Sequence, residues 1–511
     1  MSRRRNVMEK QVYNPFLPLS EYIPDGEPHV FGDRVYIYGS HDKENGDNFC
    51  MLPYVTYSAP IDDLTNWRYE GVIYTNEGDP HVTDSRKYMY APDVVKGNDG
   101  RYYLYYSLEG YGKNYVNEGV ISVAVADSPC GRFTYLGDVR NPDGSPYKHF
   151  CMFDPAVIND EGRIFLYYGA GTFSVLSKMP GFLLNSIEKN MHGLTYREMT
   201  HGKYEEDSYL GANVVELCDD MLTVKTEAKR IIPDCLEAKK KYPDFVGHGF
   251  FEASSIRKFN GKYYFIYSTE RVHELAYAIS DYPDRDFKYQ GVLISNGDIG
   301  LNGRTEAEKT RDIGNNHGSV ECINGKYYIF YHRHTNQTAY SRQACAEEIE
   351  MDAEGRFIMA ECTSCGLNQG PLVADGEYPA SIACVIKGLS KTKGAMSGQH
   401  GKKVNNPYVA ADSNGQFIKN ISNGSIVGFK YFSFEKNTTA TVTLRGTAKG
   451  KICFFTDEAC NNQVGSVDIS LEGGEWCDFQ CQINIEHIQA LYIRFEGSGK
   501  LDFIKMKFTL S

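Results

Sequence analysis

Long apolar runs and an excess of positive charge are both missing from this chain of 511 residues. No stretch approaches the roughly 20 apolar residues of a membrane helix, so we expect no membrane-embedded part. The formal net charge of -12 argues against nucleic acids and anionic membranes as partners, because both bind basic surfaces. The basic run Arg3–Arg5 precedes no apolar segment of the kind that secretory signals contain. The sequence therefore predicts a globular protein of the cytoplasm.

Paired cysteine motifs and tryptophan are also scarce. Of 14 cysteines, only Cys362 and Cys365 have the Cys-x-x-Cys spacing, and a zinc site needs a second such pair. We therefore expect reduced thiols and no zinc or redox centre. Only 2 Trp accompany 38 Tyr and 27 Phe, and helical periodicity is sparse, with Leu236–Lys241 as the best short candidate. Because Tyr and Phe favour strands, the aromatic content predicts a β-rich chain.

One sequence phrase recurs five times along the first two thirds of the chain. It consists of Gly, a polar residue, and an apolar and aromatic run that ends in Tyr. Since Gly accepts the positive φ of tight hairpin turns, each copy predicts a β-hairpin. The copies are Gly32–Tyr38, Gly100–Tyr106, Gly162–Tyr168, Gly261–Tyr267 and Gly325–Tyr331.

The spacing of this repeat indicates the fold. Three of the four intervals between successive glycines are about 60–70 residues, which suits a four-stranded sheet with its connections. The longer interval leaves room for an insertion around residues 180–240. Five such sheets predict a five-bladed β-propeller, because radial repetition protects sheet edges, whereas a β-sandwich would not explain five copies of one hairpin. We expect a tail at residues 1–13 and the propeller at 14–378.

The last part of the chain has a different pattern. The hairpin phrase stops, and short alternating strands such as Val427–Tyr431 and Leu491–Phe495 follow. Regular short strands predict a β-sandwich of the jelly-roll type over residues 379–511. The whole chain is thus expected to be all-β, with a five-bladed propeller followed by a sandwich.

An ionisable residue stands seven to nine positions before each repeated Gly. The first strand of every propeller blade lines the central channel, and all five run the same way, so these side chains should form a ring at one channel mouth. A single Asp in such a place more often caps a turn, but five in phase favour a functional site. Carboxyls held close together push their pKa values apart. The five residues are Asp25, Asp93, Asp154, Glu252 and His317.

Hydrolysis of a glycosidic bond needs two carboxyls in different protonation states, which such a ring supplies. The chain also resembles glycoside hydrolase family 43, whose catalytic domain is a five-bladed propeller, over roughly residues 14–375. Five motifs in phase with the hairpins carry the resemblance: Tyr22-Ile23-Pro24-Asp25, Ala91-Pro92-Asp93, Phe153-Asp154-Pro155, Phe251-Glu252-Ala253-Ser254 and Asn316-His317-Gly318-Ser319.

The resemblance implies catalytic roles for three carboxyls. Asp25 would be the general base that activates water, and Glu252 the general acid. Asp154 would raise the pKa of Glu252 and orient it. The family inverts anomeric configuration, so the carboxyls of Asp25 and Glu252 are expected about 6.5–9.5 Å apart. Glu27 shares a strand face with Asp25 and stays open as an alternative base.

The resemblance also implies residues that bind the sugar or a metal ion. Asp93 would shape the sugar pocket, and Arg342, in Tyr340-Ser341-Arg342-Gln343, would contact sugar hydroxyls. His317 would lie on the channel axis, where related enzymes often hold a calcium ion. No other cofactor is implied.

The expected activity is removal of terminal α-L-arabinofuranosyl residues from arabinose-containing oligo- or polysaccharides. A β-xylosidase of the same fold and a non-catalytic carbohydrate-binding propeller stay open as alternatives. A fructan- or sucrose-cleaving propeller ranks lower, because Ala253 rather than Cys follows Glu252. The C-terminal domain resembles carbohydrate-binding modules of family 6, with Trp476, Tyr408 and Phe417 as candidate sugar contacts. Arabinose- or xylose-containing oligosaccharides are the expected partners, and the oligomeric state stays open.

Overall fold

In the computed structural model the five repeated glycines all lie in hairpin turns, as predicted, with φ between 67° and 94°. The turn Asn260–Gly261 shows why the phrase works. Both residues have positive φ, 51° and 78°, which matches the twist of the strands that they connect. Phe259 and Lys262 therefore pair directly across the turn. The structure describes residues 10–110, 119–149, 151–172, 179–192, 195–199, 210–389, 405–435 and 438–510.

Each hairpin supplies the two inner strands of one propeller blade. Four blades have four antiparallel strands and the fifth has three. Blade 1 contains β1 (Glu27–Phe31), β2 (Arg34–Tyr38), β3 (Tyr54–Pro60) and β4 (Arg68–Tyr74). Blade 2 contains β5 (Arg86–Lys96), β6 (Tyr102–Gly110), β7 (Ile121–Ala126) and β8 (Thr134–Asp138). Blade 3 contains β9 (Ala156–Asp160), β10 (Arg163–Ala170), β11 (Gly211–Leu217) and β12 (Lys229–Ile232).

Blade 4 contains β13 (Phe250–Phe259), β14 (Lys262–Thr269), β15 (Glu274–Ser280) and β16 (Lys288–Ser295). Blade 5 contains β17 (Val320–Ile323), β18 (Lys326–His334) and β19 (Arg342–Ile349). The N-terminal segment lies along the outer edge of blade 5, where the Phe16 N–H donates to Ala344 O at 3.3 Å. The Asn14 side chain also exchanges two hydrogen bonds of 3.0 Å with the Ala346 backbone. The start of the propeller therefore closes the ring against its last blade.

Apolar clusters fill the spaces between adjacent blades. One such cluster joins Tyr36 and Tyr38 of β2 to Leu104 and Tyr106 of β6. Many of these tyrosines are fully buried, and their hydroxyls find polar partners at the ends of the rings, as Tyr106 does with Asp79 at 2.5 Å. This explains why the repeated phrase is rich in Tyr, whose ring fills the core while its hydroxyl stays satisfied.

The long interval between the third and fourth hairpins contains the three α-helices of the described residues, and one of them includes the predicted helical candidate Leu236–Lys241. Its helices are α2 (Gly181–His192), α3 (Tyr196–Met199) and α4 (Cys235–Lys241). The α4 helix begins where the Asp234 side chain accepts from the Glu237 N–H at 3.0 Å, which caps the free amides of its first turn. Short 3-10 helices occupy Pro243–Phe245, Leu301–Gly303, Glu306–Glu308, Gly366–Asn368 and Ala380–Ile382. None of the helices in the described ranges is long and apolar enough to cross a membrane.

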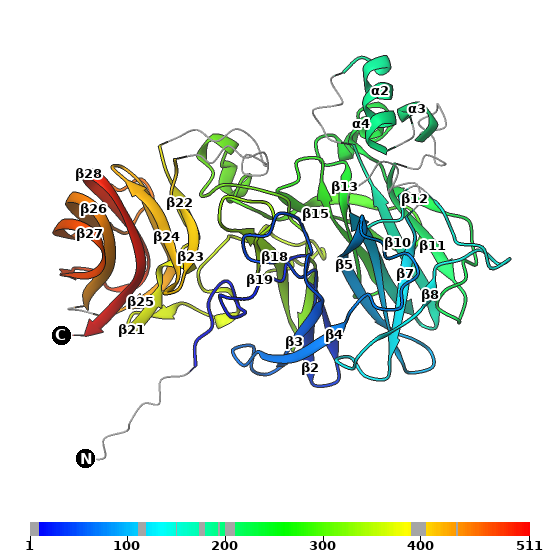
Figure 1. Cartoon of the computed structure of the whole chain (residues 1–511), viewed down its shortest axis with the longest axis horizontal. Coiled ribbons are helices and arrows are strands. Elements are labelled where there is room, and N and C mark those ends of the chain that lie inside the picture. The colour runs from blue at the N-terminus through cyan, green and yellow to red at the C-terminus, as the bar shows by residue number, and fades with distance from the viewer. Residues whose placement is uncertain are drawn as a thin grey trace.

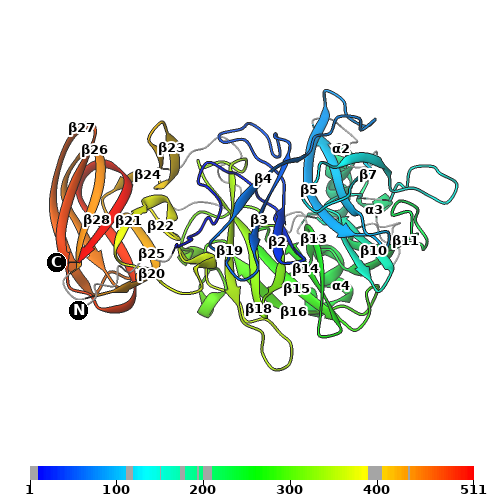
Figure 2. The ribbon, with the colours of Figure 1, turned by 90° about the horizontal axis from the view of Figure 1, so that it is seen from below.

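A second β-sheet domain lies beside the propeller along the long axis of the molecule (Figures 1 and 2). Its nine strands form one sheet, which curls around a large apolar core. Two strands before residue 379 belong to it, since β20 pairs with β25 and β21 with β28. The strands are β20 (Leu372–Val373), β21 (Gly376–Pro379), β22 (Val385–Lys387), β23 (Tyr408–Asp412), β24 (Gly415–Ser422), β25 (Ile426–Phe434), β26 (Thr438–Phe455), β27 (Gln463–Ile483) and β28 (His487–Leu510). The all-β prediction of a five-bladed propeller followed by a β-domain is confirmed.

A buried lysine joins the two domains. Lys430 on β25 is 2% exposed, and its Nζ donates to Asp298 Oδ2 at 3.0 Å and to Glu361 Oε1 at 2.8 Å. Asp298 follows the last strand of blade 4, so the ion pair crosses the domain boundary. The C-terminal domain is therefore docked in part through a buried ion pair between Lys430 and Asp298.

Replacing this lysine should destabilise the docked domain. Lys430→Met leaves the Asp298 carboxylate buried without a cation, which costs about 3–5 kcal/mol. We expect a lower urea midpoint for the first unfolding transition, measured by tyrosine fluorescence. The control Lys505→Met breaks an exposed pair with Glu377, and such pairs contribute under about 1 kcal/mol. Equal midpoints for the two variants would contradict the role given to Lys430.

Candidate active site

The residues that open the innermost strands meet at one mouth of the channel. Asp25 precedes β1, Asp154 precedes β9, Glu252 lies at the start of β13 and His317 precedes β17. The backbone is left-handed at Asp25 (φ 57°), at Asp154 (φ 46°) and at Ala253 (φ 68°). Three blades thus turn their chains in the same strained way at the same level, and such strain is concentrated at functional sites.

The His317 imidazole lies between the carboxylates of this mouth. Its Nδ1 is 4.0 Å from Asp25 Oδ1 and 3.8 Å from Asp154 Oδ2. Burial lowers the pKa of His317 to about 4, so the ring is neutral above that pH. A neutral imidazole brings the carboxylates together without adding a positive charge.

Asp154 and Glu252 are coupled through both backbone and charge. Asp154 Oδ2 accepts the Ala253 N–H at 2.9 Å, next to Glu252 in sequence. Burial, and then the negative charges of Glu252 and Asp25, raise the pKa of Asp154 well above its ordinary value. Burial, and then the charge of Asp25, raise the pKa of Glu252 to about 7, against the opposing charge of Arg342. Glu252 is therefore protonated in about half of the molecules at neutral pH.

Asp25 is held by a cation and by a histidine. Arg342 Nη1 donates to Asp25 Oδ1 at 2.8 Å, a charge-assisted hydrogen bond. The Asp25 N–H donates to His332 Nδ1 at 3.3 Å, and the opposite ring nitrogen, Nε2, lies 2.8 Å from Asn315 O. His332 therefore carries its proton on Nε2, and burial holds its pKa well below the ordinary value. The two contacts fix both the carboxylate and the left-handed backbone of Asp25.

Asp93 lies deeper in the channel than the other ring members. It is fully buried, and its partners Val157 and His29 follow Asp154 and Asp25 along their strands. Asp93 Oδ2 accepts the Val157 N–H at 2.7 Å, and Oδ1 lies 2.6 Å from His29 Nε2. Burial alone would raise the pKa of Asp93, but His29, Arg257 and the Val157 N–H together hold it below its ordinary value.

Glu27 occupies the same deeper layer and is poorly suited to act as a base. Its Oε2 accepts from Arg257 Nη2 at 2.8 Å and from Ser255 Oγ at 3.1 Å. Burial raises the pKa of Glu27 to about 8, although Arg257 opposes this, so most of it is protonated at neutral pH. A general base must be ionised, so a protonated Glu27 does not suit that role.

Two sets of side chains are candidates for binding a metal ion. One ligand atom from each of Glu27, His29 and Asp93 lies within 4.8 Å of the others, and this is the sole such cluster among the described residues. The Cys362 thiol donates to Ser295 O on β16, and the Cys365 thiol lies against the Lys430 and Tyr431 carbonyls on β25, so the two thiols contact different strands. All 14 cysteines are free thiols.

Sequence reasoning missed several residues around this mouth. The loop after β2 supplies Asp42, whose carboxylate pairs with Arg342, and Phe49, whose ring lies 4.8 Å from the Arg342 guanidinium carbon. Phe49 also packs edge-on against Tyr340, with ring centroids 4.7 Å apart. No repeat position marks this loop, so the sequence offered no signal for Asp42 or Phe49. His332 could have been found from its place at the end of the fifth repeated phrase.

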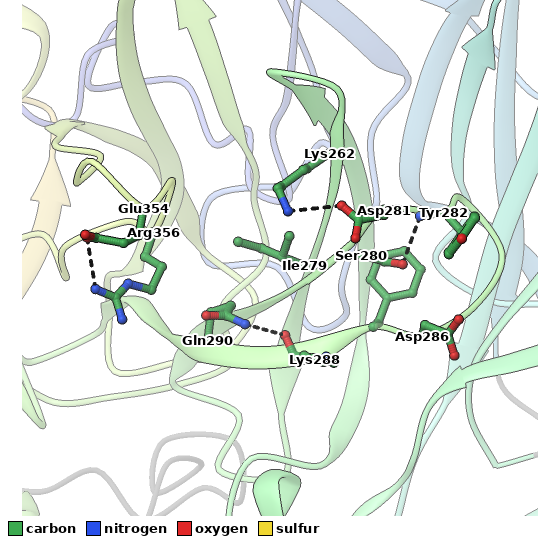
Figure 3. Close-up of a pocket in the computed structure, with 11 residues that line it drawn as sticks. Lys262, Ile279, Ser280, Asp281, Tyr282, Asp286, Lys288, Gln290, Glu354 and Arg356 are labelled. Atoms are coloured by element: carbon green, nitrogen blue, oxygen red, sulfur yellow. Dashed lines mark hydrogen bonds and ion pairs between the residues drawn. The ribbon is translucent and has the colours of Figure 1, made fainter.

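A hollow of about 750 Å³ lies on blade 4 and is not part of this site. It is lined by the first residues of β14 and β16 and the last of β15, so it lies at the channel end opposite to Glu252. Figure 3 shows ion pairs on its walls, with Lys262 facing Asp281 and Arg356 facing Glu354. These exposed side chains pair with one another.

Comparisons with known proteins agree with the geometry. The profile of "Glycosyl hydrolases family 43" matches residues 14–357. The chain is similar to a "Xylosidase/arabinosidase" of Thermoclostridium stercorarium, at 41% identity over 504 residues that span 96% of this chain and 98% of the relative. It is also similar to a "Beta-xylosidase" of Xylanibacter ruminicola, at 31% identity over 66% of this chain and 96% of the relative.

The fold is similar to that of a GH43_1 enzyme from Xanthomonas citri, whose crystal structure is complexed with xylose. The TM-score is 0.50 at 24% identity, covering 69% of this chain and 93% of that one. The matched profile begins at the segment that closes the propeller and ends just after its last blade. With a relative 41% identical along nearly its full length, this chain belongs to family 43 of the glycosyl hydrolases and is a glycosidase.

Proposed function

We propose that the protein removes terminal α-L-arabinofuranosyl residues from arabinose-containing oligo- or polysaccharides with inversion of configuration. One observation carries the proposal: Asp25 and Asp154 lie against His317, the residue after Glu252 donates to Asp154, and burial together with the charge of Asp25 raises the pKa of Glu252 to about 7. An ionised base and a protonated acid at one mouth are the pair that glycoside hydrolysis needs. The same observation favours an enzyme over a non-catalytic sugar-binding propeller.

In the proposed reaction Glu252 gives its proton to the glycosidic oxygen as the bond to the anomeric carbon breaks. Asp25 takes a proton from a water molecule, whose oxygen forms the new bond at the anomeric carbon from the opposite face. Asp154 orients Glu252 through the Ala253 N–H. It also competes with Glu252 for a proton, because two neighbouring carboxylates resist a second negative charge.

The remaining sequence-predicted residues have supporting roles in this proposal. Arg342 fixes Asp25 through Nη1 and is proposed to offer the second N–H of that nitrogen to a sugar hydroxyl. Asp93 shapes the pocket from below, by tying β5 to β9 beneath Asp154. His317 lies on the channel axis, between Asp25 and Asp154.

β-Xylosidase activity is the second candidate. Its support is the 41% identical relative named for both activities and the 31% identical relative named beta-xylosidase. A panel of 4-nitrophenyl α-L-arabinofuranoside and β-D-xyloside, together with arabinose- and xylose-bearing oligosaccharides, separates the candidates by kcat/KM. Proton NMR of the first-formed sugar tests inversion. Retention of the anomeric configuration, or no hydrolysis of any member of the panel, would refute the proposal.

Activity should fall as pH rises through about 7. Glu252 acts only when protonated, and its raised pKa of about 7 means that the proton is lost over this range. The basic limb of the kcat/KM profile, which reports the free enzyme, is expected near pH 7. A profile that stays flat to pH 9 on an oligosaccharide would show that Glu252 is not the proton donor.

We propose that His317 and Glu27 hold a calcium ion on the channel axis. Glu27 Oε1 is buried, accepts no hydrogen bond from the described residues, and lies 4.0 Å from His317 Nε2, so two free ligand atoms face each other. The ion would supply positive charge beneath the carboxylates. Calorimetric titration of EDTA-treated protein with calcium should give a binding heat that Glu27→Gln abolishes. An unchanged titration in that variant would exclude the site.

We propose that the C-terminal domain, similar to carbohydrate-binding modules of family 6, serves as a docked brace. The Arg445 guanidinium covers a face of Trp476, with its carbon 4.3 Å from the ring centroid, and is itself paired with Asp412 at 2.8 Å and Asp502 at 3.1 Å. A sugar cannot stack on that face of the indole. Affinity electrophoresis on arabinoxylan tests this, and retardation that Trp476→Ala abolishes would contradict the brace.

We propose that the enzyme acts in the cytoplasm on arabinose- or xylose-containing oligosaccharides. The free thiols suit a reducing compartment. Fractionation of source cells, with activity followed in each fraction, tests the location, and activity confined to the medium would overturn it.

A further inference from the structure

Asp42 is a buried carboxylate that the proposed reaction does not use, and both of its oxygens are engaged. Oδ2 accepts from the Arg342 backbone N–H at 3.1 Å and from Arg342 Nε at 2.8 Å. Oδ1 accepts from Arg342 Nη2 at 3.0 Å and from the Cys50 N–H at 3.0 Å. Two parallel bonds of this kind fix the plane of a guanidinium as well as its position.

Arg342 reaches Asp25 with the one nitrogen that Asp42 leaves over. Nη1 donates to Asp25 Oδ1 at 2.8 Å. The approaches of His317 and His332 to the Asp25 carboxylate, at 4.0 Å and 3.4 Å, are also to Oδ1. Within the described residues, all recorded contacts of this carboxylate therefore fall on one oxygen.

The division of Arg342 between two carboxylates has a chemical consequence. A guanidinium that faces a single carboxylate prefers two parallel hydrogen bonds, which occupy both oxygens. Without Asp42, Arg342 would turn this two-pronged edge toward Asp25 and take up the lone pairs of Oδ2. A carboxylate whose two oxygens both accept from one guanidinium is less basic and has fewer free lone pairs for water, so Asp25 would be a weaker general base.

We propose that Asp42 is a positioning residue for hydrolysis: by holding Nε and Nη2 of Arg342, it limits that cation to Asp25 Oδ1 and keeps Asp25 Oδ2 open for the attacking water. The inference rests on the proposed role of Asp25 as the general base. Asp42 itself touches neither water nor sugar in this scheme. Its effect passes through Arg342, which makes the two residues testable as a pair.

The test is a double-mutant cycle of Asp42→Asn and Arg342→Gln, with kcat and KM measured on the better 4-nitrophenyl glycoside. Asp42→Asn should lower kcat about 10- to 100-fold, since small displacements of a catalytic group cost this much. KM should change less than about threefold, because the pocket stays assembled. A loss that appears only in KM would overturn the proposal.

The second arm of the cycle separates positioning from a purely structural role. Adding Asp42→Asn to Arg342→Gln should cost less than about threefold in kcat, because the residue through which Asp42 acts is already gone. The double variant should also unfold at a higher temperature than Arg342→Gln alone, which leaves Asp42 as an unpaired buried charge. Two losses that multiply would show that Asp42 acts independently of Arg342.

His41→Gln is the matched control within the same loop. His41 Nδ1 lies 2.8 Å from Pro53 O, so the change disturbs the loop without touching Arg342. Its kcat should stay within about twofold of wild type.

Two other results would refute the proposed function itself: no hydrolysis of any glycoside by the wild-type protein, or full activity of Asp25→Asn. An inactive Asp25→Asn beside a fully active Asp42→Asn would refute only this inference.

Discussion

Glu252→Gln is expected to lower kcat/KM on an arabinose- or xylose-bearing oligosaccharide by about 10²–10⁴-fold, the range of general acid catalysis. The leaving group there is a sugar alkoxide, which is a poor leaving group unless it is protonated as the bond breaks. Gln has nearly the same shape as Glu but no acidic proton. Glu252 has a pKa of about 7 and can supply that proton at neutral pH.

The size of this loss should depend on the leaving group. On 4-nitrophenyl glycosides the departing phenolate needs little protonation, so the loss should shrink to about tenfold or less. Glu270→Gln is the control, because Glu270 is a buried carboxyl just after β14 on the same blade. Its kcat/KM should stay within about threefold of wild type. An equal loss on both kinds of substrate would remove Glu252 from the role of acid.

Asp25→Asn is expected to lower kcat about 10³–10⁴-fold on every substrate, whatever its leaving group, at the upper end of the range for general base catalysis. Every turnover needs an activated water, so a better leaving group does not compensate. The residual activity should also lose its proton donor at a lower pH. The Asp25 charge raises the pKa of Glu252, and the neutral amide removes that effect.

Glu27→Gln tests the alternative base under the same conditions. Gln has nearly the shape of the protonated Glu27, and its side-chain oxygen can still accept from Arg257. At a temperature well below the unfolding midpoint of the variant we expect at least about a tenth of wild-type kcat, because Glu27 lies below the mouth. An inactive Glu27→Gln beside an active Asp25→Asn would reverse the assignment.

The propeller and its carboxylates follow from local chemistry repeated along the chain. Gly261 and its four counterparts predicted hairpins because positive φ is a local requirement, and all five turns have it. A similar offset, of seven to nine residues, between an acidic residue and that Gly then places Asp25, Asp154 and Glu252 at one channel end. These inferences need only the direction of the strands, which the repeat supplies.

Depth along the channel could not be predicted in this way. Asp93 has the same offset as Asp25, yet it is fully buried beside His29 in a lower layer. Irregular register between Tyr90 and Asp93 on β5 changes its level in the channel. The partner of Arg342 was also out of reach, because Asp42 comes from the loop between β2 and β3, which lies outside the repeated phrase.

The edges of the C-terminal domain could not be predicted from the sequence either. Alternating strands such as Leu491–Phe495 predicted a β-domain, which the structure has. The short strands β20 and β21 carry no periodicity that could assign them to this sheet, and only their pairing with β25 and β28 does so. Lys430 alternates with apolar residues as a solvent-facing lysine would, and only the docked propeller explains its burial.

A crystal structure of Glu252→Gln with a bound arabinose- or xylose-bearing oligosaccharide tests the shared catalytic centre most directly. The account predicts that the glycosidic oxygen lies within about 3.2 Å of the side chain at position 252, with a water held between Asp25 and the anomeric carbon on the other side of the ring. A scissile sugar bound away from Asp25, or with both side chains on one face of its ring, would contradict it.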